Sequence, residues 1–277
     1  MSRTETTHVL YHAQCQDGFA GAWAAWRALG EGATYLPVQH GDPPPALPEG
    51  ARVVIVDFAY GRDVILSLRE RVGRLMILDH HKTAEEALRG LPDTVFDMDK
   101  SGAMLAWEHF HPGQEPAALI RYVQDRDLWR FELPNSREVN VALGSYPYDF
   151  ATWSGLDVDQ LVDEGRAILR FRDRTVDAII SFARTGEVGG HQVPVVNATA
   201  HWSDVGEALL RRFPEAPFVA LYFDDAEGRR RWSLRSGGEF DVGELAKRFG
   251  GGGHHAAAGF REPPRPFIPP IPMDEPA

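Results

Sequence analysis

The sequence has little cysteine and no long apolar run. The single cysteine, Cys15, excludes a disulfide within the chain, as is usual for proteins of a reducing compartment. No stretch reaches the roughly 20 apolar residues that a membrane helix needs. The N-terminus lacks the basic region and apolar segment of a secretory signal. These absences lead us to expect a cytoplasmic protein that does not bind membranes.

The sequence also lacks net positive charge. It holds 29 lysine and arginine residues against 40 aspartate and glutamate residues, which gives a formal net charge of −11. Proteins that bind long nucleic acids usually present a basic face to the phosphate backbone. We therefore expect no stable complex with long nucleic acid.

An alternation of strands and helices indicates an α/β fold. Apolar runs at 9–11, 53–56 and 75–78 read as buried strands, and helical patterns separate them. Such an order is typical of a parallel sheet. Phe19, Trp23 and Trp26 follow one another at spacings of four and three, which predicts one face of a helix. We interpret this aromatic stripe as core packing rather than as a platform for stacked bases.

Residues that can bind metals follow each of the three predicted strands. In open parallel sheets, ligands bind beyond the carboxyl ends of the strands, so these side chains should converge on one edge. A fourth contribution comes from the segment YVQDRDLWRF, in which Asp125 is preferred to Asp127, since Asp127 could pair with Arg126 or Arg130. The residues at the strand ends are His12, Asp17, Asp57, Asp79, His80 and His81.

This set of side chains suits hard divalent cations. Carboxylates together with imidazoles favour Mn²⁺, Mg²⁺ or Fe²⁺, whereas structural zinc favours clustered cysteines. Three or more carboxylates can hold two ions roughly 3.5–4 Å apart, a pair that activates water and stabilises charge at phosphorus. The side chains therefore predict a site for hard divalent cations, with room for two ions.

The order of the motifs resembles that of the DHH phosphoesterase superfamily. HAQCQDG comes first, VVIVDF second and Asp79-His80-His81 third, and FGGGGHHAAAGF at 249–260 resembles the glycine-rich motif of the companion DHHA1 domain. The resemblance covers the chain from about residue 7 to residue 262. A DHH triplet alone is common, whereas the ordered set is specific.

The resemblance implies a role for each matching residue. Asp57 would bridge two metals, His81 would contact the phosphate or protonate the leaving group, and Asp79 would bind metal or orient its neighbours. Cys15 stands where many relatives have aspartate, so it is either a soft ligand or a packing residue. The implied metal ligands are His12, Asp17, Asp57, His80 and Asp125, with Cys15 and Asp79 as weaker candidates.

The sequence pattern of the second half of the chain predicts a smaller α/β domain. A helical pattern at 157–183 leads into strand-like segments at 193–196, 218–223 and 232–234, which alternate with helical patterns at 204–212 and 241–248. Arg229-Arg230-Arg231 is expected to form a solvated turn, and Ser101 to cap a helix. The resemblance implies that the second domain binds the substrate through Gly252, Gly253, His254, Arg235 and Ser236.

The expected organisation has four parts. A DHH catalytic domain at 1–155 is followed by a connecting helix at 156–186 and a DHHA1 substrate-binding domain at 187–262. Residues 263–277 hold seven prolines and should form an extended or disordered tail. A homodimer is left open.

The expected function is metal-dependent hydrolysis of small nucleotides with two Mn²⁺ ions, or with Mg²⁺ or another divalent cation. By resemblance, the favoured substrates are short oligoribonucleotides, and 3′-phosphoadenosine 5′-phosphate is a further candidate. Three alternatives stay open: a phosphodiesterase for cyclic nucleotides or cyclic dinucleotides, a single-strand exonuclease of the RecJ type, and a nucleotide-binding sensor without catalysis. The exonuclease would need a basic channel that the sequence does not show.

Overall fold

The computed structural model describes residues 6–39 and 41–264, which form two compact units divided between Arg170 and Phe171. The division falls inside the longest helix, α8 (Val158–Ile180). Leu161 and Val162 of α8 pack into the core of the first unit, and Val176 and Ile180 pack into a core of the second. Helix α8 thus contributes side chains to cores of both units. Within the described ranges, no helix is long and apolar enough to cross a membrane.

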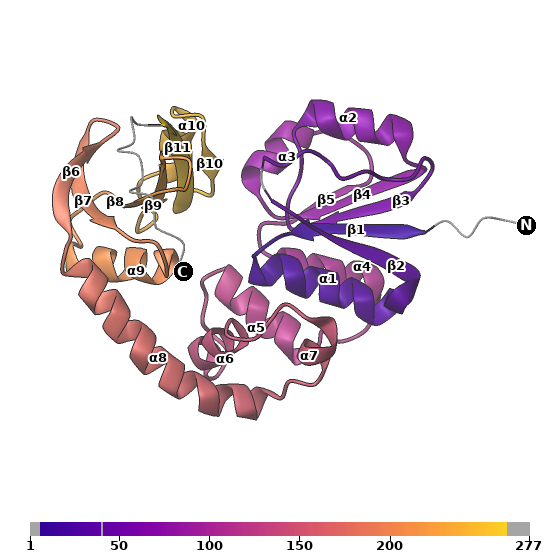
Figure 1. Ribbon diagram of the computed structural model, residues 1–277, viewed down its shortest axis with the longest axis horizontal. Helices are drawn as coiled ribbons and strands as arrows, with labels where there is room; N and C mark the ends of the chain where they lie inside the picture. Colours follow the sequence, from indigo (N-terminus) through magenta and orange to yellow (C-terminus); the bar gives the residue numbers. More distant parts are fainter. Residues whose placement is uncertain (1–5, 40, 265–277) are drawn as a thin grey trace, which may run out of the picture. The chain divides into compact units, whose positions relative to one another are not determined.

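The first unit contains a parallel sheet of five strands in the order β2-β1-β3-β4-β5 (Figure 1). The three predicted strands correspond to β1, β3 and β4, whereas β2 and β5 were not predicted. Pro37 in β2 is tolerated because β2 lies at the edge of the sheet. The strands are β1 (Thr7–His12), β2 (Ala33–Val38), β3 (Arg52–Val56), β4 (Arg74–Asp79) and β5 (Thr94–Phe96).

Helices cover both faces of this sheet (Figure 1). Side chains of β3 alternate between two cores: Val53 and Ile55 pack toward α2 and α3, and Val54 and Val56 pack toward α1 and α4. The helices of this unit are α1 (Gln16–Leu29), the 3-10 turn η1 (Gly30–Gly32), α2 (Arg62–Arg71), α3 (Lys82–Leu88), α4 (Gly102–Phe110), α5 (Ala118–Asp127), α6 (Ser136–Leu143) and α7 (Phe150–Ser154).

The strand order fixes where the site can lie. From β1 the chain passes to β2 on one side, whereas β3 pairs with the other side of β1. The two connections leave the sheet in opposite directions, and in sheets of this kind ligands bind beyond the carboxyl ends of the strands where the order reverses, here β1 and β3. His12 ends β1 and Asp57 follows β3, so both lie at this position.

The second unit has a mixed six-stranded sheet in the order β10-β11-β9-β8-β7-β6. Only the β7–β8 pair is parallel among the paired strands that the structure describes. Helix α9 packs on one face and α10 on the other. The elements are β6 (Arg184–Val188), β7 (His191–Asn197), α9 (Trp202–Arg212), β8 (Val219–Asp224), β9 (Arg229–Arg235), α10 (Val242–Lys247), β10 (Gly252–Gly253) and β11 (Ala257–Pro264).

Two sequence predictions for this unit are corrected. Arg229, Arg230 and Arg231 belong to strand β9 rather than to a solvated turn. Arg230 pairs with Asp224 of β8 at 2.8 Å, and opposite charges across a hairpin stabilise its strands. The predicted tail begins later than expected, since β11 extends to Pro264, and the remainder of the predicted tail, 265–277, lies outside the described residues.

We predict that Gly165→Ala destabilises the first unit. A Cβ atom at Gly165 of α8 would lie 2.1 Å from the backbone oxygen of Glu138 in α6, so the two helices would have to separate. Overpacking of this kind costs about 1–3 kcal/mol, more than the helix propensity that alanine adds. The measurement is the free energy of unfolding in urea. Gly32→Ala is the control, because nothing lies within 4 Å of its Cβ position, and equal stability of the two variants would contradict the prediction.

Candidate functional site

Possible metal ligands from four segments meet at the carboxyl edge of the first unit's sheet. Among the described residues of this unit, three groups of side chains each bring three ligand atoms within 4.8 Å of one another. They are His12, Cys15 and Asp57; Asp17, His80 and Asp127; and Asp57, Asp79 and His81. The sequence predicted all of these residues except Asp127.

Asp57 shares a group with His12 and also faces His80 of the group that contains Asp17 and Asp127. Its Oδ2 is 3.4 Å from Nδ1 of His12, and its Oδ1 is 3.3 Å from Nε2 of His80. The side chain is buried, and Oδ2 accepts no hydrogen bond from any described residue. The two oxygens of one carboxylate thus face imidazoles from different groups.

The backbone of Asp57 explains this orientation. Asp57 has a φ of 62°, a left-handed conformation that aspartate tolerates better than most residues. Its N–H donates to the oxygen of Leu78 in β4 at 2.9 Å, which fixes the turn to the sheet. A Cβ atom at Gly102 would lie 2.6 Å from Cβ of Asp57, so the start of α4 can approach only because residue 102 is glycine.

Asp17 is held by the N-terminus of α4. Its two oxygens accept hydrogen bonds from the N–H groups of Gly102 at 2.7 Å and Ala103 at 3.0 Å. These amide groups carry the positive end of the helix dipole and favour a carboxylate. Ser101 caps α4 as predicted, accepting a hydrogen bond from the N–H of Met104. The arrangement fixes Asp17 beside His80, whose Nε2 lies 3.8 Å from Oδ2 of Asp17.

The structure favours Asp127 over Asp125 as the fourth acidic contributor. Oδ2 of Asp127 lies 3.4 Å from Nε2 of His80. Both oxygens of Asp125 instead accept hydrogen bonds from the loop that follows α5, at 2.9 Å from the N–H of Glu132 and 3.2 Å from that of Leu133. The helical spacing carried a usable signal, because Asp127 lies four residues after the buried Val123, on the same helix face.

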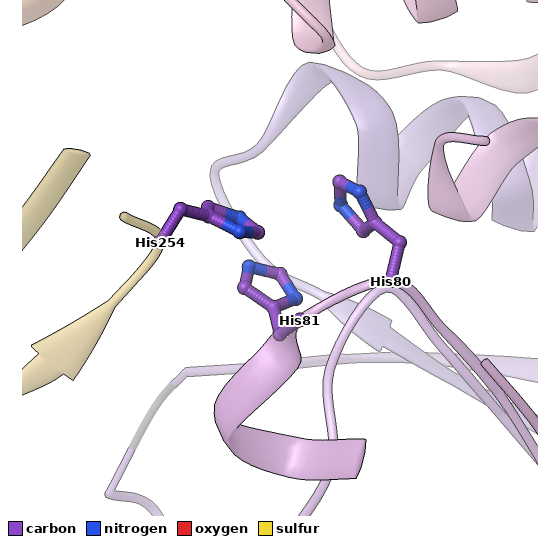
Figure 2. A group of neighbouring side chains, drawn as sticks. All are labelled: His80, His81 and His254. Atoms are coloured by element: carbon purple, nitrogen blue, oxygen red, sulfur yellow. The ribbon is translucent and has the colours of Figure 1, made fainter. Parts of the chain in front are cut away.

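The DHH triplet divides between two tasks. His80 directly follows β4 and His81 precedes the first turn of α3 (Figure 2). Oδ1 of the buried Asp79 is 2.7 Å from Nδ1 of His81 and accepts a hydrogen bond from the N–H of His80 at 2.8 Å. Burial opposes protonation of His81, but the Asp79 carboxylate raises its pKa above the ordinary value. Asp79 therefore orients His81.

The electrostatics of the cluster favour a bound cation. Burial and the carboxylates of Asp57 and Asp127 hold the pKa of Asp17 well above its usual range. Burial likewise raises the pKa of Asp127. Burial opposes protonation of His80, but the Asp57 hydrogen bond and the other carboxylates raise its pKa to about 10. Without a cation, the buried negative charge is thus compensated by protons.

Asp57 and Cys15 respond differently to this environment. Burial would raise the pKa of Asp57, but the imidazoles of His12 and His80 outweigh it and keep the pKa far below the usual range. Burial, followed by the carboxylate of Asp57, raises the pKa of the Cys15 thiol well above its ordinary value. Asp57 is therefore ionised, and Cys15 carries its proton unless a metal displaces it.

The donor chemistry fits divalent ions. Carboxylates and imidazoles suit Mn²⁺ or Mg²⁺, and Oδ2 of Asp57, which faces His12 at 3.4 Å, offers a buried oxygen ligand. His12, Asp57 and Cys15 could hold one ion, and Asp17, His80 and Asp127 a second. Bound cations would remove the need for the protons that the cluster otherwise retains.

The predicted substrate-binding residues lie in the second unit, with different local roles. Gly252 and Gly253 form β10 and pair with Gly259 and Ala258 of β11. Gly253 has a φ of 143°, and a Cβ atom there would lie 2.6 Å from the oxygen of Ala257, so packing alone requires glycine. The oxygen of His254 accepts a hydrogen bond from the N–H of Ala257 at the turn between the strands.

Arg235 and Ser236 follow one another at the end of β9. Arg235 donates to the hydroxyl oxygens of Ser203 at 3.1 Å and Ser233 at 2.9 Å. Burial lowers the pKa of Arg235 to about 10, and no carboxylate pairs with it in the described part of the second unit. Ser236 is buried, and its Oγ has no hydrogen-bond partner among the described residues.

Comparison with known proteins gives three kinds of similarity. Residues 192–264 match the DHHA1 domain family. An uncharacterised protein of Acanthamoeba polyphaga mimivirus is 29% identical over 284 residues, covering 91% of this chain and 66% of the relative. The oligoribonuclease NrnB of Bacillus subtilis is 37% identical over 70 residues, covering 25% of this chain. The chain thus spans 66% of the length of the first relative, and the NrnB match covers 17% of that protein.

Solved structures share the fold. The DHH domain of a member of the s1p family of ribosomal proteins has a TM-score of 0.51 at 13% identity, covering 92% of this chain and 82% of that one. The pGpG-specific phosphodiesterase PggH from Vibrio cholerae has a TM-score of 0.50 at 13% identity, covering 92% of both chains. Exonuclease RecJ bound to manganese has a TM-score of 0.50 at 16% identity, covering 94% of this chain and 87% of that one. The DHHA1 match and the fold shared with a DHH domain support the resemblance to the DHH/DHHA1 phosphoesterase superfamily that the sequence motifs indicate.

Proposed function

We propose that this protein is a metal-dependent phosphodiesterase that hydrolyses short oligoribonucleotides, with two divalent ions, most suitably Mn²⁺, at the carboxyl edge of the first unit's sheet. The observation that carries the proposal is the position of Asp57, whose two carboxylate oxygens face His12 and His80 from different ligand groups. A carboxylate placed in this way is suited to bridging two ions. When bound, such ions supply Lewis acidity at phosphorus and a nucleophilic water.

The residues of the chain have separate tasks in this proposal. His12, Asp57 and Cys15 hold one ion, and Asp17, His80 and Asp127 hold the other. Hydrolysis adds the oxygen of water to phosphorus and breaks one P–O bond, so the leaving oxygen needs a proton. His81, whose pKa is raised through its contact with Asp79, is suited to donate that proton.

The substrate class is inferred from charge and from relatives. NrnB is an oligoribonuclease, and PggH acts on pGpG, which is itself a dinucleotide. The net charge of −11 disfavours a long polyanion. In the second unit, the half-buried Arg235 and the buried Ser236 fit the binding of an anionic part of a small substrate.

We predict that Asp57→Asn abolishes metal-dependent turnover. An amide supplies one neutral oxygen in place of a charged bridging carboxylate, so both metal positions weaken. Hydrolysis of a diribonucleotide with saturating Mn²⁺ should fall by about two orders of magnitude or more, and bound metal should fall with it. Asp63→Asn, on the exposed part of α2, is the control and should keep full activity. Near-normal turnover by folded Asp57→Asn protein would refute the two-metal assignment.

A second prediction separates Asp127 from Asp125. Asp127→Asn should weaken Mn²⁺ binding and leave the melting temperature of the metal-free protein unchanged or raised, since it removes a buried negative charge near Asp57. Asp125→Asn should lower stability by about 1–2 kcal/mol, because one loop N–H group loses its acceptor. Calorimetric titration with Mn²⁺ and thermal unfolding in a chelator measure the two effects. The opposite pattern would restore Asp125 as the ligand.

A third prediction concerns substrate length. We expect RNAs of about two to five nucleotides to be cleaved with a higher kcat/KM than long strands. The phosphates of a longer strand face a protein of net negative charge, so they add little binding energy. The assay compares diribonucleotides, pentaribonucleotides, cyclic dinucleotides and long single-stranded DNA at one Mn²⁺ concentration and one ionic strength. Equal or faster processing of the long DNA would favour an exonuclease of the RecJ type instead.

A further inference from the structure

A column of aromatic rings runs along helix α1 of the first unit. Phe19 stacks with Phe150 at 5.0 Å between ring centroids and 12° between planes, and with Tyr148 at 5.0 Å and 21°. Phe150 also stacks with Trp26 at 5.5 Å and 19°. The column joins α1 to the start of α7 and the segment before it, which lie beside each other in Figure 1.

The column has an exposed end. Phe19 is 2% exposed, whereas Tyr148 is 42% exposed. The backbone around Tyr148 is fixed, because the N–H of Asp149 donates to the oxygen of Pro147 and the Asp149 side chain caps α7 through the N–H of Thr152. Tyr148 is therefore a firmly supported ring with part of its surface open to solvent.

This exposed ring stacks on Phe19, which lies one turn along α1 from candidate metal ligands. The N–H of Phe19 donates to the oxygen of Cys15 at 3.0 Å, so Phe19 stands one helical turn after Cys15. Asp17 belongs to the same turn. After burial, the next influence on the Tyr148 pKa is the charge of Cys15, which raises it, and the opposing one is that of Arg126, which neighbours Asp127.

We propose that Tyr148 is the platform on which a nucleobase next to the scissile phosphate stacks. The inference rests on the proposed function and adds the nucleoside part of the substrate to the phosphate chemistry. A base stacked on an aromatic side chain gains affinity whatever its hydrogen-bonding edge, so this platform binds many sequences. The ring is held by Phe19 before the substrate arrives, so stacking orders little that is not already ordered.

Trp129 is a second exposed aromatic residue that lies near a candidate ligand in the sequence. It follows Asp127 by two residues and is 37% exposed. Its ring meets Phe131 edge-on, at 78° between planes, and so lacks the parallel support that Tyr148 has from Phe19. Trp129 thus provides a matched control of similar exposure.

The experiment uses a diribonucleotide of 2-aminopurine and uridine, whose fluorescence falls when the purine analogue stacks. The full-length protein is titrated with the probe in a chelator, so that no hydrolysis occurs. Wild-type protein and Tyr148→Phe should quench the fluorescence with similar dissociation constants. Tyr148→Leu should raise the dissociation constant about fivefold or more, and Trp129→Leu should leave it unchanged.

Kinetics with Mn²⁺ give an independent readout. Tyr148→Leu should raise KM for the diribonucleotide more than it lowers kcat. On a substrate in which the corresponding base is replaced by hydrogen, the variant and the wild type should have the same KM. Unchanged quenching by folded Tyr148→Leu protein, or no quenching by the wild type, would overturn the platform. Loss of quenching in Trp129→Leu alone would assign the base to that ring instead. Quenching without hydrolysis of any nucleotide would refute the proposed function and leave the platform standing.

Discussion

The left-handed turn at Asp57 is the constraint on which the rest of the site depends. A non-glycine residue in this conformation costs about 1–2 kcal/mol, and the hydrogen bond to Leu78 holds it there. The turn aims the carboxylate between His12 and His80 instead of into the sheet. It also brings the backbone so close to α4 that position 102 has room only for glycine. Helix α4 in turn holds Asp17 through its first amide groups.

The carboxylates of Asp17, Asp57 and Asp79 are buried close together at the site. Their negative charge favours the binding of protons or cations. Burial is the main cause of the raised pKa values of Asp17 and Asp127, whereas the pKa of His80 is raised, against its burial, by the hydrogen bond to Asp57 and the neighbouring carboxylates. A ligand that binds only the folded state stabilises that state. Divalent cations would therefore act on the stability of the first unit as well as on its chemistry.

The sequence predicts the parts of the site that follow directly from strand ends. An apolar run that stops at Asp57 or at Asp79 predicts a buried strand. Its end also predicts the edge of the sheet at which the polar residues of neighbouring strands lie. The choice between Asp125 and Asp127 depends on hydrogen bonds to Glu132 and Leu133, which exist only once the loop after α5 has folded. Helical spacing places Asp127 on the face of the buried Val123, but it does not show that the loop amides occupy the carboxylate of Asp125.

Long-range pairing limits the prediction of the second unit in the same way. Arg229, Arg230 and Arg231 have the composition of an exposed turn, and the sequence pattern alone favours that interpretation. Acidic partners that precede them in the hairpin, including Asp224, stabilise the arginines within a strand. The cores are easier to predict, since Val193, Leu221 and Leu234 follow the period of a sheet and are buried.

The aromatic stripe of α1 shows how core packing and a binding surface can share one set of residues. Phe19 and Trp23 are buried, which confirms the prediction that they pack in the core. Phe19 nevertheless contacts Tyr148, a ring far along the sequence that the helical pattern could not indicate. Because Phe19 also follows Cys15 and Asp17 on α1, any shift of Phe19 would move the platform and these ligands together. If Tyr148 stacks a base as proposed, this one buried ring would set the distance between that base and the candidate ligands of α1.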